Sequence, residues 1–179
     1  MLLDERVPPA PALRRDEALL ELVKRYFTSH GPAQPQDFAW WSGLTLGDTK
    51  KGLTLAGALL RHETVDGQEF YFAAASPAPM PSAAYLLPNY DEYTIAYKDR
   101  SHFYDPGALQ APIARDNVPF AHMIVMHGRI VGAWKRTLGS KAVQVEAKFL
   151  QPPTAAQQRA LDLALKRFGE FLGLPVKTA

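Results

Sequence analysis

Residues 35–72 read PQDFAWWSGLTLGDTKKGLTLAGALLRHETVDGQEFYF, and they hold the clearest structural signals in the chain. Pro35 is typical of the first turn of a helix, and this short helix is expected to end at Gly43. Thr45 stands where an N-cap residue belongs, which predicts a further helix from Leu46 to about Ala58. The stretch therefore predicts two consecutive helices separated by a very short turn.

Two strand-like runs follow these helices. They are residues 59–63 and 69–72, and they flank Asp66-Gly67, a pair that strongly indicates a hairpin turn. Upstream, an apolar stripe at helical spacing predicts a helix that Asp16 caps and that runs to about Ser29. Three helices followed by a hairpin are typical of the winged-helix fold, in which the hairpin is the wing. The sequence therefore predicts a winged-helix domain over residues 15–75.

The second half of the chain alternates between apolar and polar residues, as strands do. The predicted strands are Tyr93–Tyr97, His122–Met126, Arg129–Lys135 and Ala142–Phe149. An amphipathic helix begins at Thr154 and closes this part of the chain. We expect a small β-barrel-like domain with a C-terminal helix over residues 89–179, and an α+β fold overall. Two proline-containing stretches, residues 1–14 and 76–88, are predicted linkers.

The composition limits the class of protein. The formal net charge is +2, which permits a nucleic-acid partner without requiring one. The chain has no cysteine, which excludes disulfides, thiolate nucleophiles and cysteine metal sites. No apolar run is long enough to cross a membrane, and Asp4 and Glu5 stand where a signal peptide would carry basic residues. We expect no membrane association and a location in the cytoplasm, with association with the nucleoid as an alternative.

The predicted recognition helix carries candidate DNA contacts near its start. Thr49, Lys50 and Lys51 would meet the major groove there, the two lysines chiefly through phosphates. Arg61, at the predicted wing, would add a further phosphate contact. The alternative is an ordinary solvated helix face that happens to carry two lysines.

The predicted hairpin of the second domain carries another set of candidates. Arg129, Lys135 and Arg136 would hold a phosphate backbone, while Trp134 stacks on a base or inserts into the duplex. The alternative for Trp134 is a place in the core of the domain, which is the commoner position of a tryptophan in a strand.

Asp91, Glu92 and Asp99 are the candidate catalytic carboxylates, since one of them with a raised pKa would serve as a general acid. Adjacent carboxylates on a strand point to opposite faces, so structural ion pairs or a connecting turn are the favoured alternative. The five histidines show no metal-ligand spacing, and the sequence contains no phosphate-binding loop or nucleophile elbow. We expect neither a metal nor a cofactor.

Three segments resemble the AlkZ-like winged-helix DNA glycosylases and their relatives. The first joins residues 25–27 and 30–33 to residues 37–45, the second joins residues 87–93 to 97–101, and the third is residues 128–136. They span most of the chain in the family's order. The resemblance implies tandem winged helices joined to a β-barrel-like part, and an activity that excises alkylated bases and unhooks interstrand crosslinks.

Catalysis in that family rests on a Gln-x-Gln or Gln-x-Asp motif in an N-terminal winged helix. Gln34-Pro35-Gln36 has the right letters but lies in a different segment of the family pattern. The resemblance therefore covers the C-terminal half of the pattern, and we expect this chain to lack the catalytic motif.

Together these observations predict a winged-helix protein that binds double-stranded DNA, damaged or undamaged, and is related to crosslink-unhooking glycosylases. Whether another protein supplies the missing N-terminal half is left open. Two alternatives stay open: an active glycosylase for alkylated bases that uses carboxylates of residues 91–100, and a non-catalytic protein-interaction module. Whether the chain is an enzyme is left open, with a binding role favoured.

Overall fold

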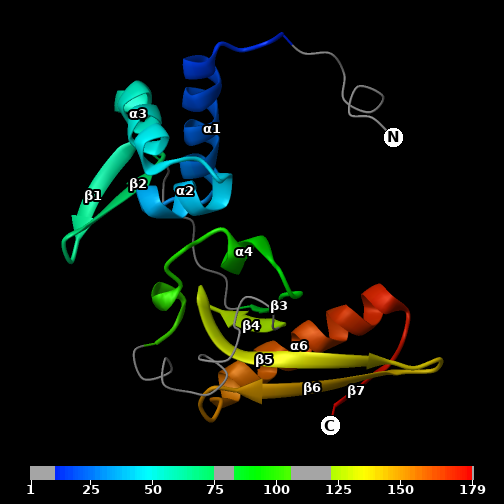
Figure 1. The fold of residues 1–179 in the computed structure, drawn as a ribbon. Coiled ribbons are helices and arrows are strands. Elements are labelled where there is room, and N and C mark those ends of the chain that lie inside the picture. Colours follow the sequence, from blue (N-terminus) through cyan, green and yellow to red (C-terminus); the bar gives the residue numbers. More distant parts are fainter. Residues whose placement is uncertain (1–10, 75–82, 106–121, 179) are drawn as a thin grey trace. The chain divides into compact units, whose positions relative to one another are not determined.

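The computed structural model describes residues 11–74, 83–105 and 122–178, which fall into two compact units. The first unit contains residues 11–74 together with Ala96–Lys98, and the second contains the other described residues. Each unit has its own buried apolar core. Figure 1 labels the helices and strands of both units.

The first unit opens with α1 (Arg15–Ser29), α2 (Pro35–Ser42) and α3 (Leu46–Ala56). α2 starts with a proline, whose missing N–H has no role at that position, and ends at Gly43 with a φ of +70° that glycine adopts without strain. The Thr45 hydroxyl accepts a hydrogen bond from the Asp48 amide at 3.0 Å, which confirms the predicted N-cap of α3. Asp16 lies in the first turn of α1 and does not cap it as predicted, because the helix begins at Arg15.

A two-stranded antiparallel hairpin follows, made of β1 (Arg61–Val65) and β2 (Gln68–Phe72). Asp66 and Gly67 both have positive φ, +50° and +76°, as the predicted two-residue turn requires. Three helices and a hairpin therefore occur in the predicted order. Their core combines an apolar stripe of α1 with side chains of α2 and α3, and it contains Leu19, Val23, Tyr26, Phe27, Phe38 and Ala56.

Three residues from later in the chain complete this unit. The Tyr26 hydroxyl donates to the Ala96 carbonyl at 3.0 Å, and the Tyr97 hydroxyl donates to the His30 carbonyl at 2.7 Å. The Lys98 amide donates to the buried Asp37 carboxylate at 2.9 Å. Ala96–Lys98 are thus held by hydrogen bonds to α1, to the residue that follows α1, and to α2.

The second unit is built on a five-stranded sheet in the order β3-β4-β5-β6-β7. Its strands are β3 (Ala84–Leu86), β4 (Met123–Met126), β5 (Arg129–Leu138), β6 (Val143–Phe149) and β7 (Val176–Thr178). Neighbouring strands are antiparallel except β6 and β7, which are parallel. His127 and Gly128, with φ of +49° and +68°, form the predicted turn between β4 and β5.

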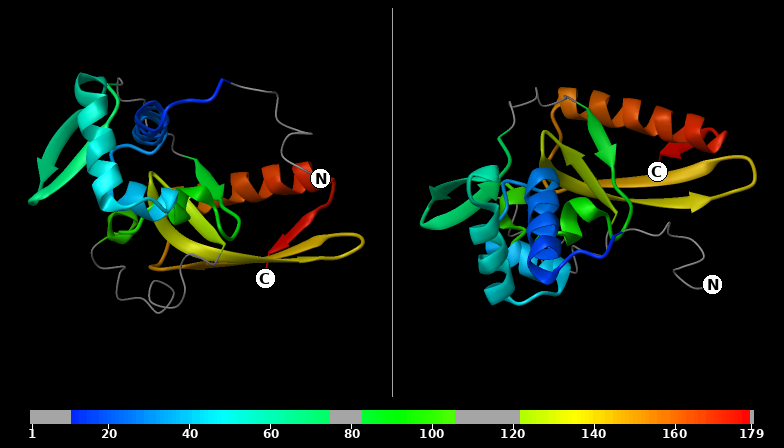
Figure 2. Two further views of the ribbon diagram at one scale, coloured as in Figure 1. Left: turned by 45° about the horizontal axis from the view of Figure 1, so that its top comes forward. Right: turned by 90° about the horizontal axis from the view of Figure 1, so that it is seen from above.

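Helix α6 (Ala155–Leu172) covers one face of this sheet, as two further views show (Figure 2). Thr154 caps its start, since its hydroxyl accepts from the Gln157 amide at 3.2 Å, and Gly173 ends it with a φ of +65°. The side chains of Leu161 and Leu165 pack on this face, in the same buried cluster as Trp134 of β5. The alternation predicted for β6 is confirmed, because Val143 and Val145 are buried on this face while Gln144 and Glu146 are exposed.

Two predictions of secondary structure for the second unit are corrected. Tyr93–Tyr97 is not a strand, because α4 (Glu92–Ile95) occupies this position, and the Asp91 side chain accepts from the Tyr93 amide at 2.9 Å. Such local bonds favour a helical turn over strand pairing. Ala84–Leu86 of the predicted linker form β3, because Ala84 is buried in the core; residues 76–82 of that linker lie outside the described residues.

The predicted β-barrel-like closure is also corrected. The described strands form an open, curled sheet whose edges are β3 and β7. Closure is not needed to bury the apolar face, because α6 covers it.

Candidate nucleic-acid interface

α3 presents fewer DNA-contact candidates than the sequence predicts. Thr49 is fully buried, and its hydroxyl donates to the Thr45 carbonyl at 3.0 Å. The prediction that Thr49 contacts DNA is therefore corrected, because its side chain belongs to the core side of the helix. Lys50 is exposed and takes part in no ion pair with the residues that the structure describes.

The other basic residues around α3 are paired with acids. The Lys51 ammonium contacts the Asp16 carboxylate at 2.5 Å, and the Arg15 guanidinium contacts the Asp48 carboxylate at 2.7 Å. Both pairs join α1 to α3, so they leave little net positive charge on this surface. Arg61 lies at the start of β1 with an exposed side chain.

Two candidates in β5 serve the fold of the second unit. Trp134 is 4% exposed, and its indole N–H donates to the Leu87 carbonyl at 2.9 Å. Its predicted stacking on a base is corrected, because the ring is buried against α6. The Arg129 guanidinium donates to the His102 and Tyr104 carbonyls, and its Nε lies 3.9 Å from the Asp105 carboxylate, so this side chain is partly engaged within the unit.

Lys135 lies on the opposite face of the sheet from α6. It pairs in register with Glu146 of β6, and both alternate with the buried residues of their strands. Lys148 follows two residues after Glu146 on that face, and Lys177 of β7 pairs with Gln144. All three lysines are exposed, and we call Lys135, Lys148 and Lys177 the lysine face.

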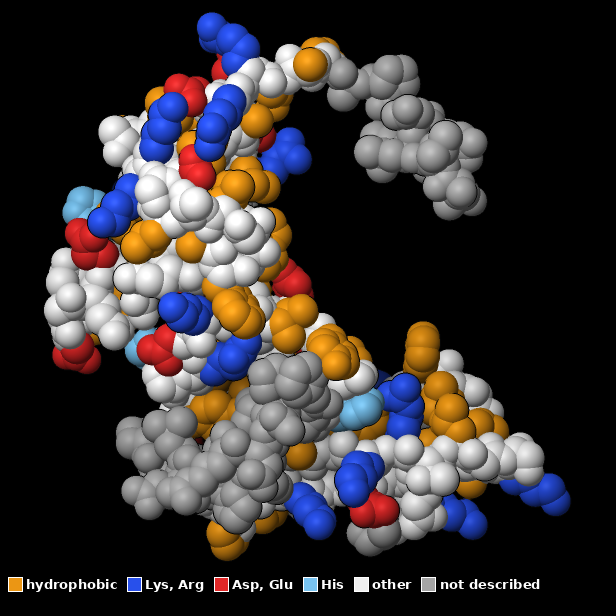
Figure 3. Space-filling view, in the orientation of Figure 1, with side chains coloured by type: hydrophobic (Ala, Val, Ile, Leu, Met, Phe, Trp, Pro, Cys, Tyr) orange, Lys and Arg blue, Asp and Glu red, His pale blue; other side chains and the backbone are white. Residues whose placement is uncertain are grey.

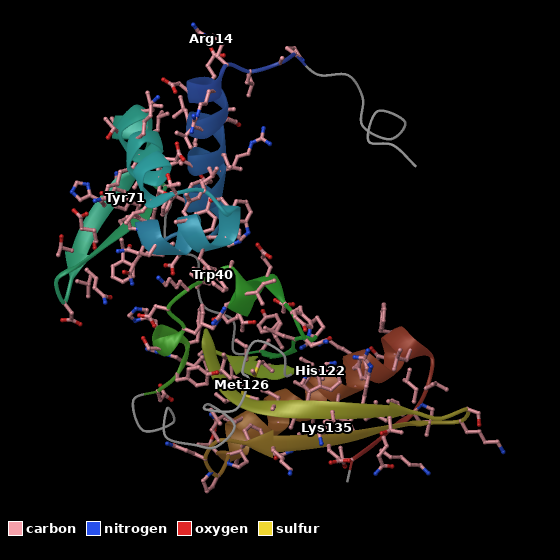
Figure 4. The ribbon with its side chains drawn as sticks, in the orientation of Figure 1. Arg14, Trp40, Tyr71, His122, Met126 and Lys135 are labelled. Carbon is pink, nitrogen blue, oxygen red and sulfur yellow. The ribbon has the colours of Figure 1, made fainter. Side chains whose placement is uncertain are left out.

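No ion pair joins a lysine of this face to any residue in the described ranges. Separate basic side chains, with an acidic one among them, lie along the second unit in the space-filling view (Figure 3), and Figure 4 labels Lys135 on β5. The face carries three ammonium groups and one carboxylate, that of Glu146, so its net charge is positive and attracts a polyanion such as a phosphate backbone.

Only one of these three lysines was among the sequence candidates. The alternation of β6 places Lys148 on the polar face, and that signal was sufficient to find it. Lys177 had no such signal, because β7 is a three-residue strand whose partner, β6, is far away in the sequence. Arg136, another predicted phosphate contact, is exposed on the α6 side of the sheet, with its Cζ atom 5.7 Å from the centre of the Trp134 ring.

The candidate catalytic carboxylates are engaged in local structure. Asp91 caps α4 through the Tyr93 amide, and Glu92 is the first residue of that helix. The Asp99 carboxylate accepts from the Ser101 amide at 2.9 Å and lies 3.5 Å from the His102 ring. Partial burial opposes ionisation of Asp99, but the hydrogen bonds from Ser101 and the nearby His102 outweigh it and lower its pKa. A lowered pKa keeps Asp99 ionised, which does not suit a general acid.

The segments that resemble a known family contact one another in the second unit. The Tyr93 hydroxyl donates to the Gly128 carbonyl at 2.8 Å, and Trp134 and Arg129 bind carbonyls of residues 87–104 as described above. The second and third segments are therefore joined by hydrogen bonds at the start of β5, and Tyr97 and Lys98 of the second segment bond to the first.

Neither a cluster of metal-ligating side chains nor a membrane-spanning helix occurs in the described ranges. No group of three or more metal-ligating side chains occurs among these residues. None of the helices in the part of the chain that the structure covers is long and apolar enough to cross a membrane.

Comparisons with known proteins place the chain beside one family. The family described as DNA glycosylase AlkZ-like matches residues 2–171. Among solved structures, Streptomyces sahachiroi DNA glycosylase AlkZ is similar, with a TM-score of 0.70 at 21% sequence identity over 95% of this chain and 48% of that chain. The chain thus spans about half the length of AlkZ and shares its fold over that half. A search of curated proteins finds no match.

Proposed function

Because the chain belongs to the family of AlkZ-like DNA glycosylases, we propose that it binds duplex DNA through the lysine face and acts in DNA repair. The observation that carries the proposal is the set of three exposed lysines on three adjacent strands, none of which forms an ion pair within the described ranges. Lysines of this kind bind phosphates without reading sequence, which suits a protein that must examine DNA of any sequence.

The geometry of the lysine face fits an extended phosphate backbone. Neighbouring strands lie about 4.8 Å apart, and residues two positions apart on a strand are separated by about 6.8 Å. The registers of β5, β6 and β7 then separate the Cα atoms of Lys135 and Lys148 by about 8 Å, and those of Lys135 and Lys177 by about 12 Å. Long, mobile lysine side chains span the remaining distance to separate phosphates.

We assign the first unit to the winged-helix class from its order of three helices and a hairpin, with α3 as the recognition helix. Lys50 and Arg61 would supply its phosphate contacts, whereas Lys51 would contribute less because Asp16 already pairs with it. The first unit is thus an additional DNA-binding part of the proposal.

The test is a salt series of DNA-binding titrations with a fluorescent duplex. The variant replaces the three lysines by glutamine (Lys135→Gln, Lys148→Gln and Lys177→Gln). Three lost phosphate contacts should weaken binding and reduce the slope of log affinity against log salt by about 2.7. The matched control removes three basic charges that are already in ion pairs with Glu21 or Glu170: Lys24→Gln, Arg25→Gln and Lys166→Gln.

The control should change the slope by less than half as much, because Glu21 or Glu170 already compensates each of its three charges. Equal slopes for the wild type and the lysine-face variant would contradict the proposal. Absence of duplex binding at low salt would favour the protein-interaction alternative.

Base excision by this chain itself is a second candidate, favoured by its family. Asp99 is one of the candidate catalytic carboxylates, and its pKa is lowered. It would therefore act as an ionised group beside the positively charged sugar that forms when the base departs. Incubation with alkylated duplex, followed by detection of abasic sites, tests this activity. Product from the wild type that Asp99→Asn removes would support it, and no product above a buffer control would exclude it for the substrate used.

A further inference from the structure

Glu146 occupies the middle of the lysine face. It lies directly opposite Lys135 on the neighbouring strand and two residues from Lys148 on its own strand. On its other side, Lys177 pairs with Gln144, two residues before Glu146. Glu146 is exposed on the same face as the three lysines, so an acid stands at the centre of a basic surface.

This carboxylate is not consumed by a close ion pair. Within the described ranges, no lysine or arginine nitrogen lies within ion-pair distance of Glu146, although Lys135 is its register partner. A phosphate placed over the centre of the face would meet this negative charge before it could contact all three lysines. Like charges brought together at an interface oppose binding and so exclude unsuitable partners.

We propose that Glu146 determines which nucleic acid the lysine face accepts, disfavouring single strands relative to duplexes. This inference rests on the function proposed above. A duplex has two backbones separated by a groove, about 6 Å wide on the minor side and about 12 Å on the major side. The lysines can then contact phosphates at the groove edges, while Glu146 lies over the groove, which contains no phosphate.

A flexible single strand has no such gap. To reach the same three lysines, its one backbone must cross the region that Glu146 occupies. Each nucleotide of that backbone carries a phosphate, so a phosphate meets the carboxylate there. Glu146 therefore penalises the single strand more than the duplex. Removal of the acid would raise the affinity for both nucleic acids. Glu146 therefore contributes selectivity between them and not affinity.

The experiment compares one labelled oligonucleotide, single-stranded and paired with its complement, in anisotropy titrations at fixed salt. The wild type is compared with Glu146→Gln, which keeps the size of the side chain and removes its charge. The control is Glu170→Gln on α6, which changes the net charge equally but lies away from the lysine face.

Glu146→Gln should strengthen single-strand binding about threefold to fivefold and duplex binding less than twofold, which lowers the duplex preference. Glu170→Gln should leave that preference unchanged. An equal change for both nucleic acids, or no change for either, would overturn the role of Glu146 while leaving DNA binding intact. A wild type that binds neither nucleic acid would refute the proposed function itself.

Discussion

The hydroxyl of Tyr104 is a buried polar group whose hydrogen-bonding capacity is unused within the part of the chain that the structure describes. The side chain is 5% exposed and packs with Met123, Val125 and Ile130. Burial raises the pKa of Tyr104 to about 12, and the nearby Arg100 only partly opposes this effect. A buried hydroxyl without a partner reduces stability, because it has lost its bonds to water.

Tyr104→Phe should therefore raise the free energy of unfolding by about 1 kcal/mol at neutral pH. The alkaline behaviour adds a second signature. Because the folded pKa lies above the unfolded value of about 10, the wild type loses stability as the pH rises from 10 to 12, by up to about 2 kcal/mol. Urea unfolding at pH 7 and pH 11 checks both points. A variant that is less stable at pH 7, or that shows the same alkaline loss, would contradict this account.

At the scale of elements, the packing of α1 on α3 depends on Gly52. A Cβ built on Gly52 would lie 2.5 Å from Val23 Cγ2 and 3.2 Å from Leu19 Cγ, both closer than ordinary contact. The absence of a side chain thus allows the two helices to approach. This requirement outweighs the poor helix propensity of glycine.

Gly52→Ala should destabilise the first unit by about 1–3 kcal/mol, because one of the helices must shift to admit the methyl group. Gly47→Ala on the same helix is the matched control, since the nearest atom to its Cβ is the Thr45 hydroxyl at 3.6 Å. That control should be neutral or slightly stabilising. Urea unfolding followed by tryptophan fluorescence measures both variants. Equal effects at the two glycines would show that the close approach of α1 and α3 is not limiting.

At the scale of the whole molecule, DNA affinity depends on which basic groups are still available for phosphates. Lys50 and Lys51 are neighbours on α3, but only Lys51 contacts an acid, Asp16. A lysine that already has a partner must lose that contact, or share it, to bind a phosphate.

Lys50→Gln should therefore reduce the slope of log affinity against log salt by about 0.9, the contribution of one phosphate contact. Lys51→Gln should reduce it by less than half as much. Salt-dependent duplex titrations of the two variants make the comparison directly. If Lys51→Gln had the larger effect, the α1–α3 ion pair would have to open in the complex, and if neither had any effect, α3 would not contact DNA.

The sequence by itself determined most of the local structure. Thr45, Asp66-Gly67, His127-Gly128 and Thr154 mark helix starts and turns at the positions where the structure has them. These signals are reliable because a cap or a left-handed turn depends on interactions within a few residues. The resemblance to the AlkZ-like family was likewise evident from short segments, and the family match over residues 2–171 confirms it.

Only the tertiary structure decided which side chains remain on the surface. Thr49 and Trp134 have suitable chemistry for DNA contacts, but packing against other elements buries both. Lys177 joins the lysine face only because β7 pairs with β6, whose Gln144 is 33 positions earlier in the chain. Local sequence carries little information on such distant pairing, since its free energy comes from contacts that exist only after the chain has folded.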